Sequence, residues 1–128
     1  IYHDSHHVIT GYKANLIGEC EIGAWEIAAG CGTYWAAWMY NGMAMLSGMI
    51  IAPKRTFKAF VRGRHARSLY GMDTQTILGM NTEALRHYTG VDVPTPAATF
   101  RDYSAFGAIA ALGVTTMATV LTGLFLLF

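Results

Sequence analysis

Two long runs without a charged residue limit the possible folds of this chain more than any other feature of its sequence. No Asp, Glu, Lys or Arg occurs from residue 27 to 53 or from residue 103 to 128. Since a helix rises about 1.5 Å per residue, about 20 apolar residues cross the hydrocarbon core of a membrane. The chain has 128 residues, 53% of them hydrophobic. In a soluble protein of this length, too few other residues remain to cover two such helices on all sides. We therefore predict an all-α membrane protein, with transmembrane helices at 27–53 and 102–128, rather than two buried helices of a soluble protein.

The charges outside these runs are unevenly distributed. Residues 1–26 hold Lys13 against four acidic residues and form a predicted acidic arm, whereas residues 54–102 hold eight cations against four acidic residues. The basic connection at 54–101 should therefore lie on the cytoplasmic side, or its stromal or matrix equivalent, with both termini in the other compartment. Its first part also suits anionic lipid headgroups or an acidic partner, although a simple topology signal is the alternative.

Local signals predict short helical turns in the connection. Residues 81–88 suit two turns, with Asn81 or Thr82 as the cap and Gly90 past the end. Thr99, followed three residues later by Asp102, has the form of a capping box, which places the start of the second span near residue 100.

Small residues recur at every fourth position in both spans. In lipid, such residues let helices approach closely, although small residues are also common in membrane helices without this role. The candidate packing residues are Gly32, Gly48, Gly107, Ala111, Thr115 and Gly123.

Asn41 lies in the middle of the first uncharged run. A buried amide without partners costs about 1–3 kcal/mol, so it must bind something. Three hypotheses remain open: a hydrogen bond between helices, a ligand or donor to a tetrapyrrole, and part of a transport pathway. Trp35 and Trp38 share a face and suit either a flat ligand or a neighbouring helix, whereas Met45 is an adaptable filler that favours core packing.

The remaining reactive side chains predict no chemistry. His3, His6 and His7 could bind a surface metal, but without a further ligand we expect a solvated arm and no metal site. Cys20 and Cys31 lie too far apart along a helix to form a disulfide. No nucleophile with a base, phosphate loop or nucleic-acid module is evident, so we predict neither an enzyme nor a nucleic-acid-binding protein.

Two segments carry a resemblance to a known family. They are GMIIAP (48–53) and PAATFRDYSAFGAIAALG (96–113). Together with the layout, they resemble the small peripheral photosystem I subunits of the PsaK, PsaG and PsaR type, over about half of the chain. The first helix ends on Ala52 and Pro53 as in that family, but the Gly-Arg before this end and the histidine of the second helix are absent.

The resemblance implies a non-catalytic thylakoid subunit at the junction of photosystem core and antenna, in contact with lipids and both groups of subunits. It implies bound chlorophyll a and carotenoid, the connection on the stromal side and both termini in the lumen. Asn41 is then the first candidate for pigment contact, with Trp35, Trp38 and Met45 beside it. The rival hypotheses are an accessory subunit of a respiratory complex in the mitochondrial inner membrane and one part of an oligomeric transporter.

Overall fold

The computed structural model describes residues 1–127 and is helical throughout its regular parts, which confirms the all-α prediction. The chain divides into two units, residues 1–97 and residues 98–128. The first unit contains α1 (Tyr2–Thr10), α2 (Leu16–Ala29), α3 (Trp35–Ile51), α4 (Pro53–Arg64), α5 (Thr74–Gly79) and α6 (Thr82–Thr89). The second contains α7 (Phe100–Leu127).

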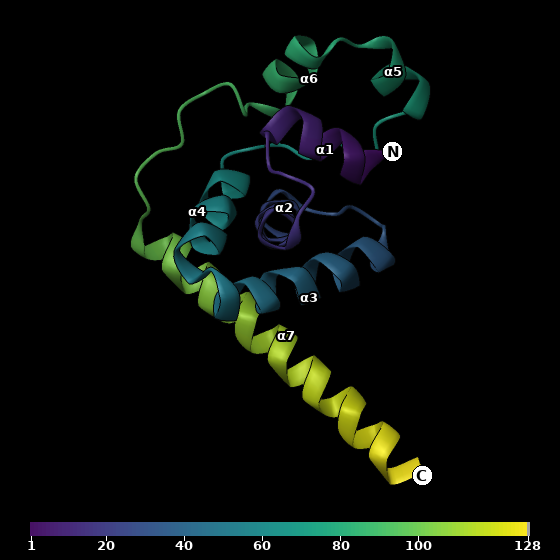
Figure 1. Ribbon diagram of the computed structural model, residues 1–128, viewed down its shortest axis with the longest axis vertical. Helices are drawn as coiled ribbons and strands as arrows, with labels where there is room; N and C mark the ends of the chain where they lie inside the picture. The colour runs from purple at the N-terminus through teal and green to yellow at the C-terminus, as the bar shows by residue number, and fades with distance from the viewer. Residues whose placement is uncertain (128) are drawn as a thin grey trace. The chain divides into compact units, whose positions relative to one another are not determined.

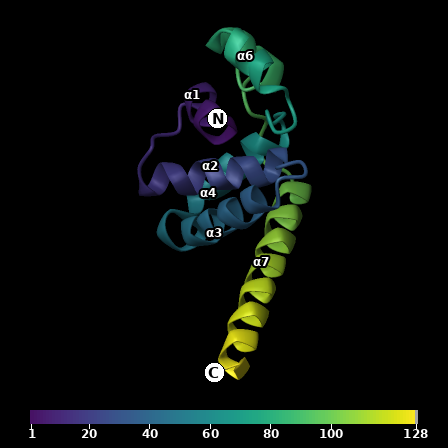
Figure 2. The same ribbon diagram turned by 90° about the vertical axis from the view of Figure 1, so that its right-hand side faces the viewer.

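Helix α2 forms the centre of the first unit. Figure 1 shows it end-on between α1, α3 and α4, and Figure 2 shows it from the side, above α3. The Asn15 side chain caps the helix by accepting a hydrogen bond of 2.9 Å from the Gly18 amide. Gly30, with φ of 94°, ends it. Almost every residue from 18 to 27 is buried, because neighbours cover this helix on several sides.

Three glycines let the helices approach α2 closely. A Cβ added at Gly23 would lie 2.7 Å from the Ala44 Cβ of α3, and one at Gly48 would lie 2.7 Å from the Cys20 Cβ of α2. At Gly63 of α4, an added Cβ would lie 2.9 Å from the Ala28 Cβ. Gly48, one of the predicted packing residues, thus lies against α2 of the same chain, whereas Gly23 and Gly63 were not among those predicted.

The prediction of one helix over 27–53 is wrong. The chain leaves α2 at Gly30 and turns through Gly32, and both residues have positive φ, 94° and 55°, which a continuous helix cannot contain. Gly32 therefore lies in a loop and not in the predicted helical stripe. Helix α3 has 17 residues and ends at Ala52, and Pro53 starts α4.

The predicted placement of residues 1–26 and 54–101 on opposite sides of a membrane is also wrong. The two segments hydrogen-bond directly: the Leu69 amide donates to His6 Nε2 at 2.9 Å, and Arg62 donates to the Thr10 carbonyl at 2.9 Å. Apolar side chains from both segments share one core, formed by Ile9, Leu69, Ile77 and Leu85. Residues 1–26, predicted as an acidic arm, contain α1 and most of α2.

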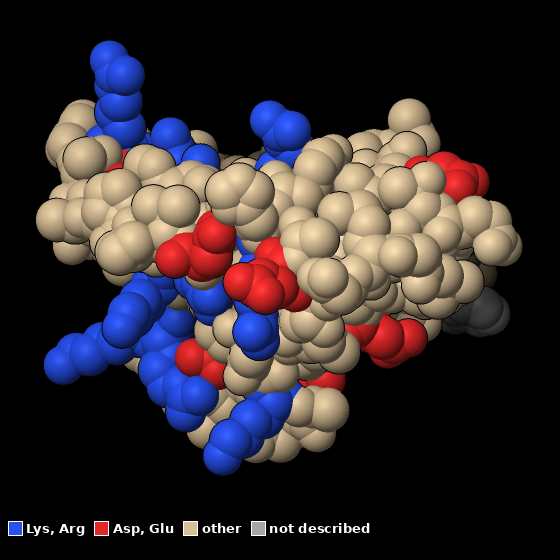
Figure 3. Space-filling view, turned by 90° about the horizontal axis from the view of Figure 1, so that it is seen from above, with Lys and Arg blue, Asp and Glu red and all other residues tan. Residues whose placement is uncertain are grey.

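Within the connection, the predicted helical turns are confirmed. Asn81 accepts a hydrogen bond of 2.8 Å from the Ala84 amide at the start of α6, and Gly90, with φ of 75°, ends that helix. Lys and Arg side chains stand out from the left-hand part of the face in Figure 3. Helix α4 carries five cations, namely Lys54, Arg55, Lys58, Arg62 and Arg64.

Helix α7 has 28 residues, and among residues 1–127 it is the one helix long and apolar enough to cross a membrane. Its start follows the predicted capping box, because Asp102 accepts hydrogen bonds from the Thr99 amide at 2.7 Å and the Thr99 hydroxyl at 2.8 Å. The predicted packing residues Gly107, Ala111, Thr115 and Gly123 are all exposed on this helix. Their proposed contacts therefore stay a prediction. Residue 128, the last of the predicted span, lies outside the described residues.

Candidate functional site

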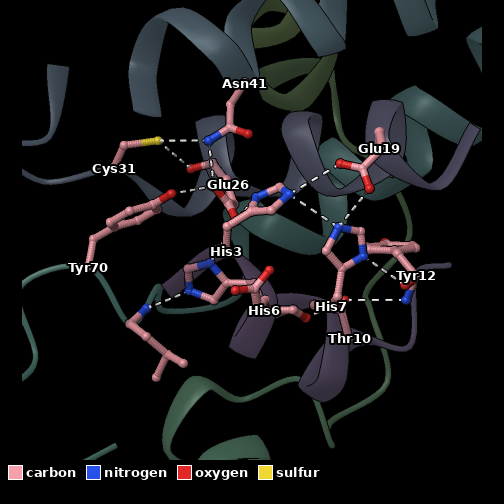
Figure 4. Close-up of polar contacts among 12 residues, drawn as sticks. His3, His6, His7, Thr10, Tyr12, Glu19, Glu26, Cys31, Asn41 and Tyr70 are labelled. Atoms are coloured by element: carbon pink, nitrogen blue, oxygen red, sulfur yellow. Dashed lines mark hydrogen bonds and ion pairs between the residues drawn. The ribbon is translucent and has the colours of Figure 1, made fainter. Parts of the chain in front are cut away.

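A buried carboxylate, Glu26 of α2, is the centre of the most densely connected polar group in the first unit (Figure 4). Its side chain is fully buried and accepts hydrogen bonds from four residues, here called the Glu26 cluster. His3 Nδ1 lies 2.9 Å and His6 Nδ1 2.8 Å from Oε1, while the Tyr70 hydroxyl lies 2.6 Å from Oε2. The Asn41 amide also donates to Oε2.

The cluster stabilises a negative charge away from water. Burial by itself disfavours the ionised form of Glu26, but the hydrogen bonds from His3, His6 and Tyr70 outweigh it and lower the pKa to about 2. The hydrogen bond to Glu26 in turn raises the pKa of His3 to about 9, against the opposing effect of burial. Because four donors surround the carboxylate, the charge is compensated where it lies.

The hydrogen bonds also fix which ring nitrogens carry protons. His6 Nε2 accepts from the Leu69 amide, so its Nδ1 must hold the proton donated to Glu26. His7 Nδ1 lies 2.9 Å from the Tyr12 carbonyl oxygen, which can only accept, so this nitrogen is also a donor. Both assignments follow from partners that have a single possible role.

Beside the Glu26 cluster, three side chains form a small triangle, here called the His3–His7–Glu19 group. His3 Nε2 lies 3.2 Å from His7 Nε2 and 3.2 Å from Glu19 Oε2, and His7 Nε2 lies 3.2 Å from Glu19 Oε1. The two histidines are one turn apart on α1, and Glu19 projects from the first turn of α2. One ligand atom from each residue lies within 4.8 Å of the others, a spacing that could hold a metal ion.

A pocket of about 370 Å³ borders both groups. His3 and Glu19 line one part of it, and the rest of the lining is largely apolar. Those other lining residues are Ala36, Ala37, Tyr40, Asn41, Ala44 and Tyr70. The pocket therefore brings an open, mostly apolar space next to the His3 imidazole and the Glu19 carboxylate.

The four predicted pigment-contact residues differ in burial. Asn41 and Met45 of α3 are buried, whereas Trp35 is 76% exposed and Trp38 40% exposed. The Trp38 indole donates to the Gly32 carbonyl at 3.0 Å. Since Asn41 donates from α3 to Glu26 of α2, the hypothesis of a hydrogen bond between helices is confirmed for this residue.

Sequence reasoning missed the acidic half of the site. The prediction of a solvated histidine arm is wrong, because His6 is fully buried and His3 and His7 both contact Glu19. Glu19 and Glu26 are seven residues apart, and His3 and His7 are four apart, so each pair shares a helix face. Those two spacings were the available signal. Cys20 and Cys31 are free and buried.

Comparisons with protein-family models, curated proteins and solved structures found no match to this chain.

Proposed function

We propose that this chain is a non-catalytic accessory subunit of a larger membrane complex, anchored by a single transmembrane helix, α7. The observation that carries the proposal is the composition of that helix. From Tyr103 to Leu127 it has no charged side chain. These residues extend over roughly 37 Å of helix, enough to cross a hydrocarbon core of about 30 Å with some tilt.

The topology of the proposal differs from a two-span protein. Because hydrogen bonds join α1 to the connection, the whole first unit lies on one side of the membrane. By the positive-inside rule, the cations of α4 and Arg101 favour the stroma, matrix or cytoplasm for that side. Only the C-terminal end of α7 then faces the opposite compartment.

An exposed apolar face on α3 supports a role inside a complex. Trp35, Tyr40 and Ile50 are 76%, 73% and 86% exposed, on the helix that buries Asn41 and Met45 against α2. Large contiguous apolar surface is unfavourable in water and is typical of contacts with another protein or with lipid. This face suits a neighbouring membrane subunit.

In its narrower form, the proposal places the chain in photosystem I, as the family resemblance implies. Chlorophyll or carotenoid would then pack on the exposed indoles of Trp35 and Trp38, since Asn41 already donates to Glu26. The alternative is a mitochondrial respiratory complex. An absorption spectrum of the purified native complex separates the two, because chlorophyll absorbs in the red, whereas haem bands alone support respiration.

The membrane anchor can be tested first. We expect the chain to remain in the membrane pellet after alkaline carbonate extraction, and a Val114→Arg, Leu121→Arg variant to enter the supernatant. Each arginine near the helix centre costs about 2.5–3.5 kcal/mol of insertion free energy. A Val114→Leu, Leu121→Ile variant is the matched control and should stay in the pellet. Extraction of the unmodified chain by carbonate would refute the anchor.

A further inference from the structure

The His3–His7–Glu19 group has the geometry of a metal-binding site. Its three nitrogen–nitrogen and nitrogen–oxygen distances are all 3.2 Å. Ligands at the corners of a tetrahedron around zinc, at about 2.0–2.1 Å from the ion, are about 3.3 Å apart. The two ring nitrogens are thus separated as a bound ion would require, and each lies at a similar distance from one of the two Glu19 oxygens, Oε2 for His3 and Oε1 for His7.

The two rings direct their Nε2 atoms toward one shared position beside Glu19. His7 commits Nδ1 as a donor to the Tyr12 carbonyl, and His3 directs Nδ1 at the Glu26 carboxylate. Both Nε2 atoms therefore turn their lone pairs inward, toward each other and toward Glu19, when the rings are neutral. When His3 is protonated, its Nε2–H instead donates within the group, so a bound metal ion would take the place of that proton.

The surrounding residues also supply what a metal site needs beyond its ligands. Metal-binding histidines usually donate their second nitrogen to a carboxylate or a backbone carbonyl, which fixes the ring and increases its basicity. Here His3 has the Glu26 carboxylate and His7 has the Tyr12 carbonyl. Glu26 is itself held by His6, Asn41 and Tyr70, so the support for His3 is rigid.

We propose that His3 Nε2, His7 Nε2 and the Glu19 carboxylate bind one zinc ion, with Glu26 and the Tyr12 carbonyl as positioning groups. Two imidazole nitrogens among three ligands favour zinc over magnesium or calcium, which prefer oxygen. Three protein ligands leave at least one coordination position for water. Since His3 and Glu19 line the pocket of about 370 Å³, that position is open to it. This inference does not depend on the proposed membrane function.

Zinc binding to the full chain in detergent tests the proposal. After treatment with a chelator and its removal, we expect one Zn²⁺ per chain by equilibrium dialysis with elemental analysis, and no comparable binding of Mg²⁺. X-ray absorption of the loaded protein should show only nitrogen and oxygen ligands, at about 2.0–2.1 Å. Less than stoichiometric zinc, equally tight magnesium, or sulfur in the first shell would overturn the assignment.

Variants locate the site. His7→Ala and Glu19→Gln should each abolish stoichiometric binding, and since Glu19 is partly exposed, its loss should leave the helical content unchanged. His87→Ala is the matched control, because that ring is exposed and pairs with Asp92 outside the site, so zinc binding should be unchanged. Glu26→Gln should weaken zinc binding by about 10–100-fold, the usual effect of removing a supporting group. Full zinc binding by His7→Ala and Glu19→Gln would show that the ion binds elsewhere.

Discussion

The close contact at Gly23 gives the sharpest test of the fold around the site. Adding one methyl group, in Gly23→Ala, would place a Cβ 2.7 Å from the Ala44 Cβ and 2.9 Å from the Asn41 carbonyl oxygen. Ordinary contacts begin near 3.4 Å, so α3 must move away from α2 at the residue that donates to Glu26. Overpacking of this kind costs about 1–3 kcal/mol.

The displacement of α3 also weakens the hydrogen bond from Asn41 to the Glu26 carboxylate. Hydrogen bonds to charged groups contribute about 1.5–3 kcal/mol. Alanine regains about 1 kcal/mol over glycine in helix propensity. The net expected loss in the free energy of unfolding is therefore about 1.5–5 kcal/mol.

Gly42 is the matched control for this substitution. It lies in the interior of α3, and a Cβ there would meet no atom within 4 Å. Gly42→Ala should therefore stabilise the protein by up to about 1 kcal/mol through helix propensity alone. Both variants add one methyl group to a helical glycine. If their changes in the free energy of unfolding have opposite signs, the difference comes from the contact between α2 and α3 at Gly23.

The assay is thermal unfolding of the full chain in detergent, followed by circular dichroism at 222 nm. For a unit of this size, 1 kcal/mol shifts the midpoint by about 4–8 °C. We expect Gly23→Ala to melt below, and Gly42→Ala above, the unmodified chain. Equal stabilisation by both substitutions would mean that α2 and α3 do not approach closely at Gly23, and the reasoning would fail.

Three further outcomes are expected. Glu26→Gln should destabilise the protein by about 3–5 kcal/mol in the same melts, because the four groups that donate to Glu26 lose their buried carboxylate acceptor. Glu83→Gln is the control: Glu83 is exposed, so its loss should change stability by less than about 0.5 kcal/mol. Gly107→Leu and Gly123→Leu should lower incorporation into the native complex, measured by co-purification, without shifting the melting temperature; normal incorporation would contradict close packing of α7. Asn81→Ala should cost about 1 kcal/mol through loss of the α6 cap, and an unchanged melt would exclude that cap as a stabilising contact.

Local signals predicted the parts of the fold that depend on neighbours in sequence. The caps at Asn81 and Thr99 and the stop at Gly90 were predicted correctly, because each is decided within four residues of the chain. The apolar, uncharged composition of α7 likewise identified a helix without reference to anything else.

The first uncharged run was misassigned because absence of charge does not show how a segment is divided. Gly30 and Gly32 adopt positive φ and turn the chain, but glycine is also common inside membrane helices, so the sequence did not distinguish a break from a packing position. Because the prediction counted only uncharged residues, it merged the end of α2 with α3 into one helix. The chain turns between them so that α3 packs against α2, and this tertiary contact is not visible in a count of charges.

The candidate site was missed for a related reason, since its charge and its partners come from different predicted regions. Glu26 stood at the edge of an acidic arm and Asn41 in a predicted membrane span, so the two were never considered as partners. In the structure, the Asn41 amide of α3 donates a hydrogen bond to the Glu26 carboxylate of α2. This pairing offsets the free-energy cost of burying both polar groups. The carboxylate then has a second oxygen to hold His3, whose far nitrogen faces His7 and Glu19. A polar residue in an apolar run, such as Asn41, therefore indicates that a buried polar or charged partner lies opposite it. In this chain that partner is Glu26, which also orients His3, a ligand of the proposed metal site.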